Sequence, residues 1–132
     1  MGEERRVPRS SAGAEGIVRG LTLLTAVPVI ALAVFYGYVL RARLALGVWP
    51  RPYAPDPTAL DAPVHLFLAR VLLVAPLAAA PVGLALAAAG LVLDRREAPR
   101  VIRRFLGFAL VWGIWFLLMR LDPGEVLAWI LD

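Results

Sequence analysis

The chain has 132 residues, 61% of them hydrophobic, and a formal net charge of +4. A soluble domain of this length buries only part of the surface that its unfolded chain exposes. An apolar content this high therefore excludes a water-soluble fold. The absence of cysteine excludes disulfides, thiolate metal sites and cysteine nucleophiles. All 14 basic residues are arginine, and most flank apolar segments. This placement is typical of membrane topology, so we expect one membrane-embedded domain and no nucleic-acid partner.

The first apolar segment covers residues 17–40 and is long enough to span a bilayer. Residues 1–16 before it are charged or small with almost nothing to bury, and we expect a disordered tail there. Residues 31–33 also fit the pattern of a signal-peptide cleavage site. Because apolar residues continue to Leu40, an uncleaved anchor is favoured, with a local kink at Pro28.

Residues 41–62 form a predicted loop, since their prolines forbid a continuous helix. Asp61 is placed to cap the next helix, with Pro63 in the first turn, where a missing N–H does no harm. The prolines of the loop are Pro50, Pro52, Pro55 and Pro57.

The second apolar segment, residues 64–93, carries a single internal charge, Arg70. As a helix it is about 45 Å long, which exceeds the hydrocarbon core of about 30 Å. It must therefore tilt, project beyond the core, or bend, and Pro76 and Pro81 favour a bend.

The third apolar segment, residues 103–121, is near the lower length limit for a span. Asp122 and Glu125 then form a capping-box pattern, which predicts a helix over residues 123–131. This helix is too short to cross a bilayer and is expected at the interface. The predicted fold is therefore all-α and integral to the membrane, with three transmembrane helices and a short C-terminal interfacial helix in one domain, residues 17–132.

Arginine placement predicts the orientation of the three spans. Nine arginines lie before the first span or between the second and third, and four lie on the opposite side. Since arginine-rich flanks stay in the cytoplasm, we expect the N-terminus inside and the C-terminus and proline loop outside. The nine are Arg5, Arg6, Arg9, Arg19, Arg95, Arg96, Arg100, Arg103 and Arg104, and the four are Arg41, Arg43, Arg51 and Arg120.

Small residues recur at every fourth position of the second helix. Such a ridge lets another helix approach closely, which favours association in lipid. Complementary small pairs lie on the first segment (Ala33, Gly37) and the third (Ala109, Gly113). An alanine-rich composition without an interface is the alternative, and the sequence leaves open whether the partner lies within the chain or in another copy. The ridge consists of Ala75, Ala79, Gly83 and Ala87.

Arg70 is a functional candidate because a charge within a membrane segment is costly. Its long stem favours snorkelling to the interface, and a buried partner such as Asp122 is the alternative. Asp56, Asp61 and His65 complete a candidate polar site near the start of the same helix. One histidine with scattered acids is a weak metal set, so no metal and no cofactor is expected. No catalytic constellation is present, and we expect no enzyme activity.

The stretch from Gly47 to Pro57 fits the pattern G-x-x-P-x-x-x-x-P-D-P between two apolar helices. It resembles a loop of small, uncharacterised bacterial multi-spanning membrane proteins, in which a lysine often follows the last proline, where Thr58 stands here. The resemblance implies a bacterial cytoplasmic membrane protein and carries no activity with it.

The sequence favours a non-enzymatic accessory or interaction protein that packs against itself or against a larger membrane protein. The alternative is a small oligomeric transporter or channel lined by Arg70, His65 or Asp61. Transport requires these polar groups to face one cavity, whereas helical geometry places Arg70 about 140° from His65.

Overall fold

The computed structural model describes residues 10–52, 55–93 and 95–131, which contain helices and no β-strand. The three long helices and the short C-terminal helix confirm the predicted all-α class. In chain order the elements are α1 (Ser10–Leu46), the 3-10 helix η1 (Pro57–Leu60), α2 (Pro63–Leu93), α3 (Ala98–Leu121) and α4 (Val126–Leu131).

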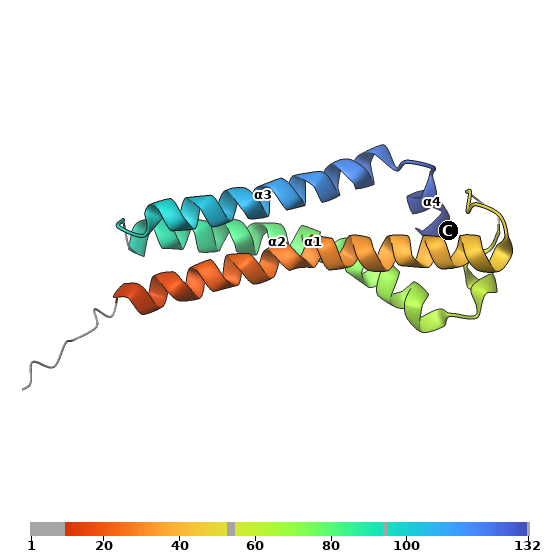
Figure 1. Cartoon of the computed structure of the whole chain (residues 1–132), viewed down its shortest axis with the longest axis horizontal. Helices are drawn as coiled ribbons and strands as arrows, with labels where there is room; N and C mark the ends of the chain where they lie inside the picture. The colour runs from red at the N-terminus through yellow and green to blue at the C-terminus, as the bar shows by residue number, and fades with distance from the viewer. Residues whose placement is uncertain (1–9, 53–54, 94, 132) are drawn as a thin grey trace, which may run out of the picture.

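The long helices α1, α2 and α3 pack side by side in an elongated bundle (Figure 1). Each is long and apolar enough to cross a membrane. At 1.5 Å per residue they measure about 55, 46 and 36 Å, so each exceeds a hydrocarbon core of about 30 Å. Helix α2 ends and α3 begins at one end of the bundle, the hairpin end (Figure 1). The proline loop, η1 and α4 lie at the other end, the loop end (Figure 1).

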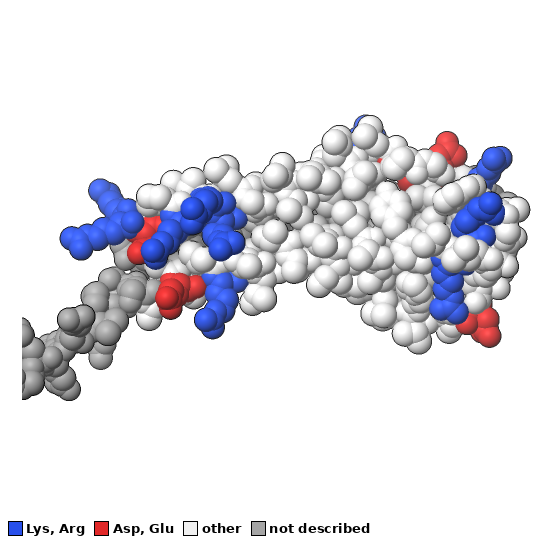
Figure 2. Space-filling view, in the orientation of Figure 1, with Lys and Arg blue, Asp and Glu red and all other residues white. Residues whose placement is uncertain are grey.

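The surface of the bundle is apolar along its middle. In the face that Figure 2 shows, arginine and acidic side chains gather toward the two ends and leave a largely uncharged band between them. Leucine, isoleucine, valine and phenylalanine side chains are exposed along all three long helices. Large exposed apolar areas mark surfaces that another apolar phase covers, and a bilayer covers all sides of such a bundle.

The start of α1 departs from prediction, because the helix begins at Ser10 rather than at residue 17. Residues 10–16 were expected to be disordered and instead form the first turns. Ala14 and Ile17 are buried in the bundle, so tertiary contacts extend the helix beyond the apolar segment. The rest of the expected tail, residues 1–9, lies outside the described residues.

The end of α1 lies at Leu46 rather than at the predicted residue 40. Gly47 follows with φ +72°, the left-handed conformation that commonly ends helices. Its N–H donates to the Arg43 carbonyl at 3.1 Å. Arg43 donates to the Gly47 carbonyl in turn and lies over the Trp49 ring, 5.6 Å from its centroid. The termination signal is therefore Gly47, six residues beyond the point where apolar residues become mixed with arginine.

Helix α2 occupies Pro63–Leu93, as predicted. The predicted N-cap is wrong, because the Leu66 N–H donates to the Ala62 carbonyl and Ala62 is therefore the capping residue. Asp61 instead ends η1 with φ 44°, and its N–H donates to the Thr58 carbonyl. A residue in this left-handed conformation cannot adopt the extended backbone that an N-cap requires.

Two prolines lie inside α2, and the helix changes direction along its length in Figure 1. Pro76 and Pro81 each lack an N–H donor and crowd the carbonyl four residues earlier. The Trp112 indole of α3 donates to the Pro76 carbonyl at 3.0 Å. The carbonyls that the two prolines leave without a helical donor are those of Leu72 and Leu77, so the Trp112 bond is an additional link between α3 and α2.

Helix α3 begins at Ala98, five residues before the predicted start at residue 103. Pro99 lies in its first turn, where a missing N–H does no harm, and Val101 is fully buried. The charged connection between the second and third apolar segments is not apolar, so the sequence predicts no span there. Burial of Val101 and a proline-compatible first turn extend the helix into it.

Helix α4 is shorter than predicted, covering Val126–Leu131 instead of residues 123–131. Its apolar side packs on the bundle. The buried residues are Val126, Trp129 and Ile130.

The predicted capping box is also wrong in its details. Asp122 ends α3 with φ 38°, and Glu125, the expected partner acid, has φ 58°. The Asp122 carboxylate nevertheless accepts from the N–H groups of Leu127 (2.8 Å) and Ala128 (3.3 Å). It therefore caps α4 from across a turn, because residues 123–125 reverse the chain before the helix begins.

Candidate functional site

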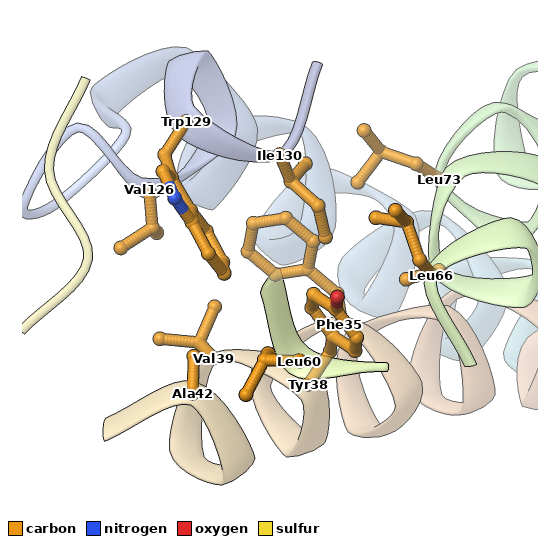
Figure 3. Close-up of a cluster of buried hydrophobic side chains, with 11 residues drawn as sticks. Phe35, Tyr38, Val39, Ala42, Leu60, Leu66, Leu73, Val126, Trp129 and Ile130 are labelled. Atoms are coloured by element: carbon orange, nitrogen blue, oxygen red, sulfur yellow. The ribbon is translucent and has the colours of Figure 1, made fainter. Parts of the chain in front are cut away.

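A buried apolar cluster joins α1, η1, α2 and α4 at the loop end. In Figure 3, Val126 and Trp129 point from α4 toward Val39 and Ala42 of α1. We call this region the loop-end cap and define it as residues 55–61 and α4, with the side chains that hold them. The cluster comprises Phe35, Tyr38, Val39, Ala42, Leu60, Leu66, Ala69, Leu73, Val126, Trp129 and Ile130.

Trp129 is the largest fully buried side chain of the described residues. Its ring stacks on Tyr38, with centroids 5.8 Å apart and an interplanar angle of 26°. Its indole N–H donates to the Pro55 carbonyl. One side chain of α4 thus binds both α1 and the proline loop.

Tyr38 fixes the proline loop from the side of α1. Its hydroxyl is buried and donates to the Pro57 carbonyl at 2.6 Å. Its ring also meets the His65 ring edge to face, with centroids 5.0 Å apart. His65 Nε2 lies 3.1 Å from the Val34 carbonyl of α1, within hydrogen-bond distance. Tyr38 and His65 therefore link α1, η1 and α2.

Arg70 binds α4. Its Nε donates to the Ile130 carbonyl at 2.8 Å, and the side chain is half-buried. The last carbonyls of a helix have no partner within the helix, so this bond satisfies one of them. Arg70 does not pair with Asp122, the expected buried partner, whose carboxylate binds N–H groups of α4.

Asp56 orders the start of η1. Its carboxylate accepts from the Thr58 hydroxyl and from the Thr58 N–H, each at 2.7 Å. These hydrogen bonds lower the pKa of Asp56 below its ordinary value, and the positive charge of Arg70 acts in the same direction. Asp56 is exposed, so its carboxylate stays in contact with solvent.

The candidate polar residues do not form one site. Asp61 and His65 border an open hollow of about 390 Å³ that Arg41 also lines, whereas neither Asp56 nor Arg70 lines it. Among the residues that the structure describes, no three histidine or acidic side chains gather as metal ligands would. The arrangement thus separates the groups that a shared polar path would need.

The small-residue ridge of α2 packs inside the chain. Ala79, Gly83 and Ala87 are buried, and Ala75 is half-buried. A Cβ added at Gly83 would lie 2.5 Å from the Phe108 ring of α3, closer than real Cβ contacts. At Gly83 the ridge therefore packs against α3, and Ala79, Gly83 and Ala87 are covered within the chain itself.

The small pairs on α1 and α3 lie differently. Ala33 and Gly37 are exposed, and a Cβ added at Gly37 meets nothing within 4 Å. Ala109 and Gly113 are half-buried, and a Cβ at Gly113 likewise meets nothing. The α1 pair thus lies on a face that the chain itself leaves uncovered.

The sequence did not single out Tyr38 or Trp129 as cap anchors. The only sequence signal for Trp129 was that a bulky aromatic residue lies in a C-terminal segment too short to span a membrane. Such a residue is as common at a membrane interface as in a buried core, so the signal did not distinguish the two. Tyr38 has a similar environment in the sequence to Tyr36, and only the fold shows which hydroxyl meets a carbonyl.

The polar side chains of the loop-end cap bind backbone groups. Tyr38, Arg70 and Trp129 donate to carbonyls, and Asp122 accepts from N–H groups. Such bonds fix a loop and a short helix on a scaffold, which makes the cap a rigid structural element. Comparison with models of known families, with curated proteins and with solved structures gives no match to this chain.

Proposed function

We propose that this chain is a non-enzymatic interaction protein of a bacterial cytoplasmic membrane, which associates with another transmembrane helix through the exposed face of α1. The partner helix belongs to a second copy or to a larger membrane protein. The bacterial location follows from the resemblance of the proline loop, and the association follows from the geometry of α1.

One observation carries the proposal: the α2 ridge is buried within the chain, while the small pair Ala33 and Gly37 on α1 is exposed. Leu40 lies on the same face of α1 at helical spacing and is about half exposed (54%). Small residues flanked by larger apolar ones let two helices approach closely, and such packing drives association in lipid.

The transporter hypothesis has less support than the interaction hypothesis. Arg70 binds the Ile130 carbonyl and His65 lies against the Val34 carbonyl, so both side chains have backbone partners. The three side chains do not face a common path, since Arg70 does not line the hollow that His65 and Asp61 border.

The proposed orientation has the N-terminus in the cytoplasm and the loop-end cap outside, from the nine-to-four distribution of arginines. Topology reporters fused after Ser11 and after Asp132 are expected on opposite sides of the membrane. Reporters on the same side would refute a three-span protein of this orientation.

Site-directed crosslinking in native membranes tests the association. The chain lacks cysteine, so Ala33→Cys carries a photo-crosslinker at a single position, and Leu84→Cys, exposed on α2, is the control. We expect a discrete adduct from position 33, identified by mass spectrometry as a dimer or a heteromer. Adding Gly37→Leu should abolish it by blocking close approach.

Two outcomes would refute the proposal. One is an adduct from Leu84→Cys as abundant as that from Ala33→Cys, because contact would then not be specific to α1. The other is an adduct that persists unchanged with Gly37→Leu. Gly37→Leu places its side chain outside the bundle, since a Cβ there meets no atom within 4 Å, so the fold itself should be unaffected.

A further inference from the structure

An open groove of about 560 Å³ lies between α1 and α3 in the half of the bundle nearest the hairpin end. Arg103 and Arg104 of α3 line it together with Thr22 of α1, and Val29 and Ile30 of α1 line it further along the helix. Thr22 and Ile30 are eight residues apart, so the groove extends about 12 Å along α1. It is polar at one end and apolar at the other.

Gly107 keeps the groove open on the side of α3. It lies one turn beyond Arg103 and Arg104, and a Cβ added there meets no atom within 4 Å. A larger residue would fill the space without displacing the helices. The apolar end is therefore accessible from the surface that faces lipid.

The polar end of the groove carries two positive charges with unused donors. Within the described residues, Arg103 and Arg104 form no hydrogen bond or ion pair and are exposed. The guanidinium fork matches phosphate oxygens and binds them through paired hydrogen bonds. The hydroxyl of Thr22 donates to the Val18 carbonyl at 2.9 Å, so the arginines are the donors that an anion would meet.

We propose that this groove binds one anionic phospholipid, with the phosphate between Arg103 and Arg104 and an acyl chain along Val29 and Ile30. Charge complementarity selects an anionic headgroup, and the apolar end distinguishes a lipid from a free phosphate. The groove lies in the half of the bundle where the charged end meets the uncharged band (Figure 2). A lipid headgroup is expected at this boundary, because its acyl chains extend along the apolar surface. Basic pockets between transmembrane helices bind anionic lipids in this way.

Native mass spectrometry of the full chain tests the site. The protein is purified in a non-ionic detergent and mixed with equal amounts of phosphatidylglycerol and phosphatidylcholine with the same acyl chains. We expect one phosphatidylglycerol molecule to bind in preference. Arg103→Gln or Arg104→Gln should weaken its binding about tenfold, the loss expected for one charge-assisted hydrogen bond.

Two variants separate the site from general charge and from misfolding. Arg95→Gln removes one positive charge at the same end without lining the groove, and it should leave the lipid preference unchanged. Gly107→Leu keeps every charge but fills the groove, and it should reduce binding by a similar factor. Circular dichroism of each variant should match that of the wild type.

Three results would overturn the proposal. The first is equal binding of the two lipids by the wild-type chain. The second is equal weakening by Arg95→Gln and Arg103→Gln. The third is full displacement of phosphatidylglycerol by an equal concentration of glycerol phosphate, which would show that the apolar end contributes nothing and that the ligand is a free phosphate ester.

Discussion

Arg70 and Ile130 lie 60 residues apart in the chain, and the Arg70 Nε donates to the Ile130 carbonyl at 2.8 Å. Helix α4 has only six residues, too few to be stable in isolation. It persists because Asp122 binds its first N–H groups and Arg70 binds one of its last carbonyls, while Trp129 anchors its middle. The charge of Arg70 inside α2 is thus explained by its hydrogen bond to α4.

Replacing Arg70 should release α4 from the bundle. Arg70→Met keeps an unbranched apolar stem but removes the donor, which should cost about 1.5–3 kcal/mol, the usual contribution of a hydrogen bond from a charged group. Ile130→Cys is fully buried in the cap and is the sole thiol of the chain, so its maleimide labelling reports release. We expect labelling to be at least about tenfold faster with Arg70→Met.

The control for this experiment is Arg120→Gln, which removes an exposed charge near the same end of the bundle. It should leave the labelling rate of Ile130→Cys unchanged. If Arg70→Met also leaves the rate unchanged, the bond between Arg70 and Ile130 does not hold α4.

The Tyr38 hydroxyl should contribute measurably to stability. Tyr38→Phe keeps the stacked ring but leaves the Pro57 carbonyl without its donor, which should lower the free energy of unfolding by about 1 kcal/mol. Unfolding by SDS in mixed micelles, followed by circular dichroism, measures this. Tyr36→Phe is the matched control, because the Tyr36 hydroxyl forms no hydrogen bond within the described residues. Equal effects of both variants would contradict the assignment.

The sequence predicted α2 more accurately than the other helices for a physical reason. Both ends of α2 are marked chemically, by Pro63 and by the change from apolar to charged residues after Leu93. The ends of α1 and the start of α3 lie in mixed sequence, where hydropathy falls before the helix ends. There the bounds depend on the left-handed Gly47 and on buried contacts of Ile17 and Val101, and no local pattern shows these buried contacts.

The candidate site was predictable only as a set of residues. The sequence singled out Arg70 as costly and Asp56 as part of a proline-framed loop, and the structure places both at the loop-end cap. The partners of Arg70 and Trp129 were not predictable, because Ile130 and Pro55 contribute backbone carbonyls, which every residue has. The neighbour of the α2 ridge was likewise not predictable. Its spacing indicates close packing, but it does not show whether the neighbour is another copy or, as at Gly83, Phe108 of the same chain.

Gly83 should tolerate no side chain, because a Cβ there would lie 2.5 Å from the Phe108 ring. Gly83→Ala should therefore destabilise the bundle by about 1–3 kcal/mol, the usual cost of overpacking. Gly37→Ala, on the exposed face of α1, should be neutral or slightly stabilising, since alanine favours helix more than glycine does. The free energy of unfolding in mixed micelles distinguishes the two.

A second substitution tests whether Phe108 is the cause. Phe108→Leu removes the ring edge that a Cβ at Gly83 would meet, so Gly83→Ala should cost less in that background than in the wild type. Strictly additive effects of the two substitutions would show that the cost of Gly83→Ala arises elsewhere.

Asp56 should titrate below the ordinary aspartate pKa of about 3.9, because Thr58 donates two hydrogen bonds to its ionised carboxylate. A lowered pKa in the folded state means that the carboxylate stabilises the fold above the unfolded-state pKa. This contribution is lost as pH falls through the folded-state pKa. The loop-end cap should therefore be unchanged from about pH 8 to pH 5 and should loosen only under more acidic conditions.

The Thr58 amide resonance, followed by NMR in micelles, reports this titration directly, because its N–H donates to the Asp56 carboxylate. Thr58→Val removes the hydroxyl donor and keeps the N–H, so the midpoint should rise toward the ordinary value without reaching it. Asp56→Asn should abolish the transition, since the amide does not ionise. A midpoint at or above the ordinary aspartate value in the wild type, or one that Thr58→Val leaves unchanged, would show that these hydrogen bonds do not order the start of η1.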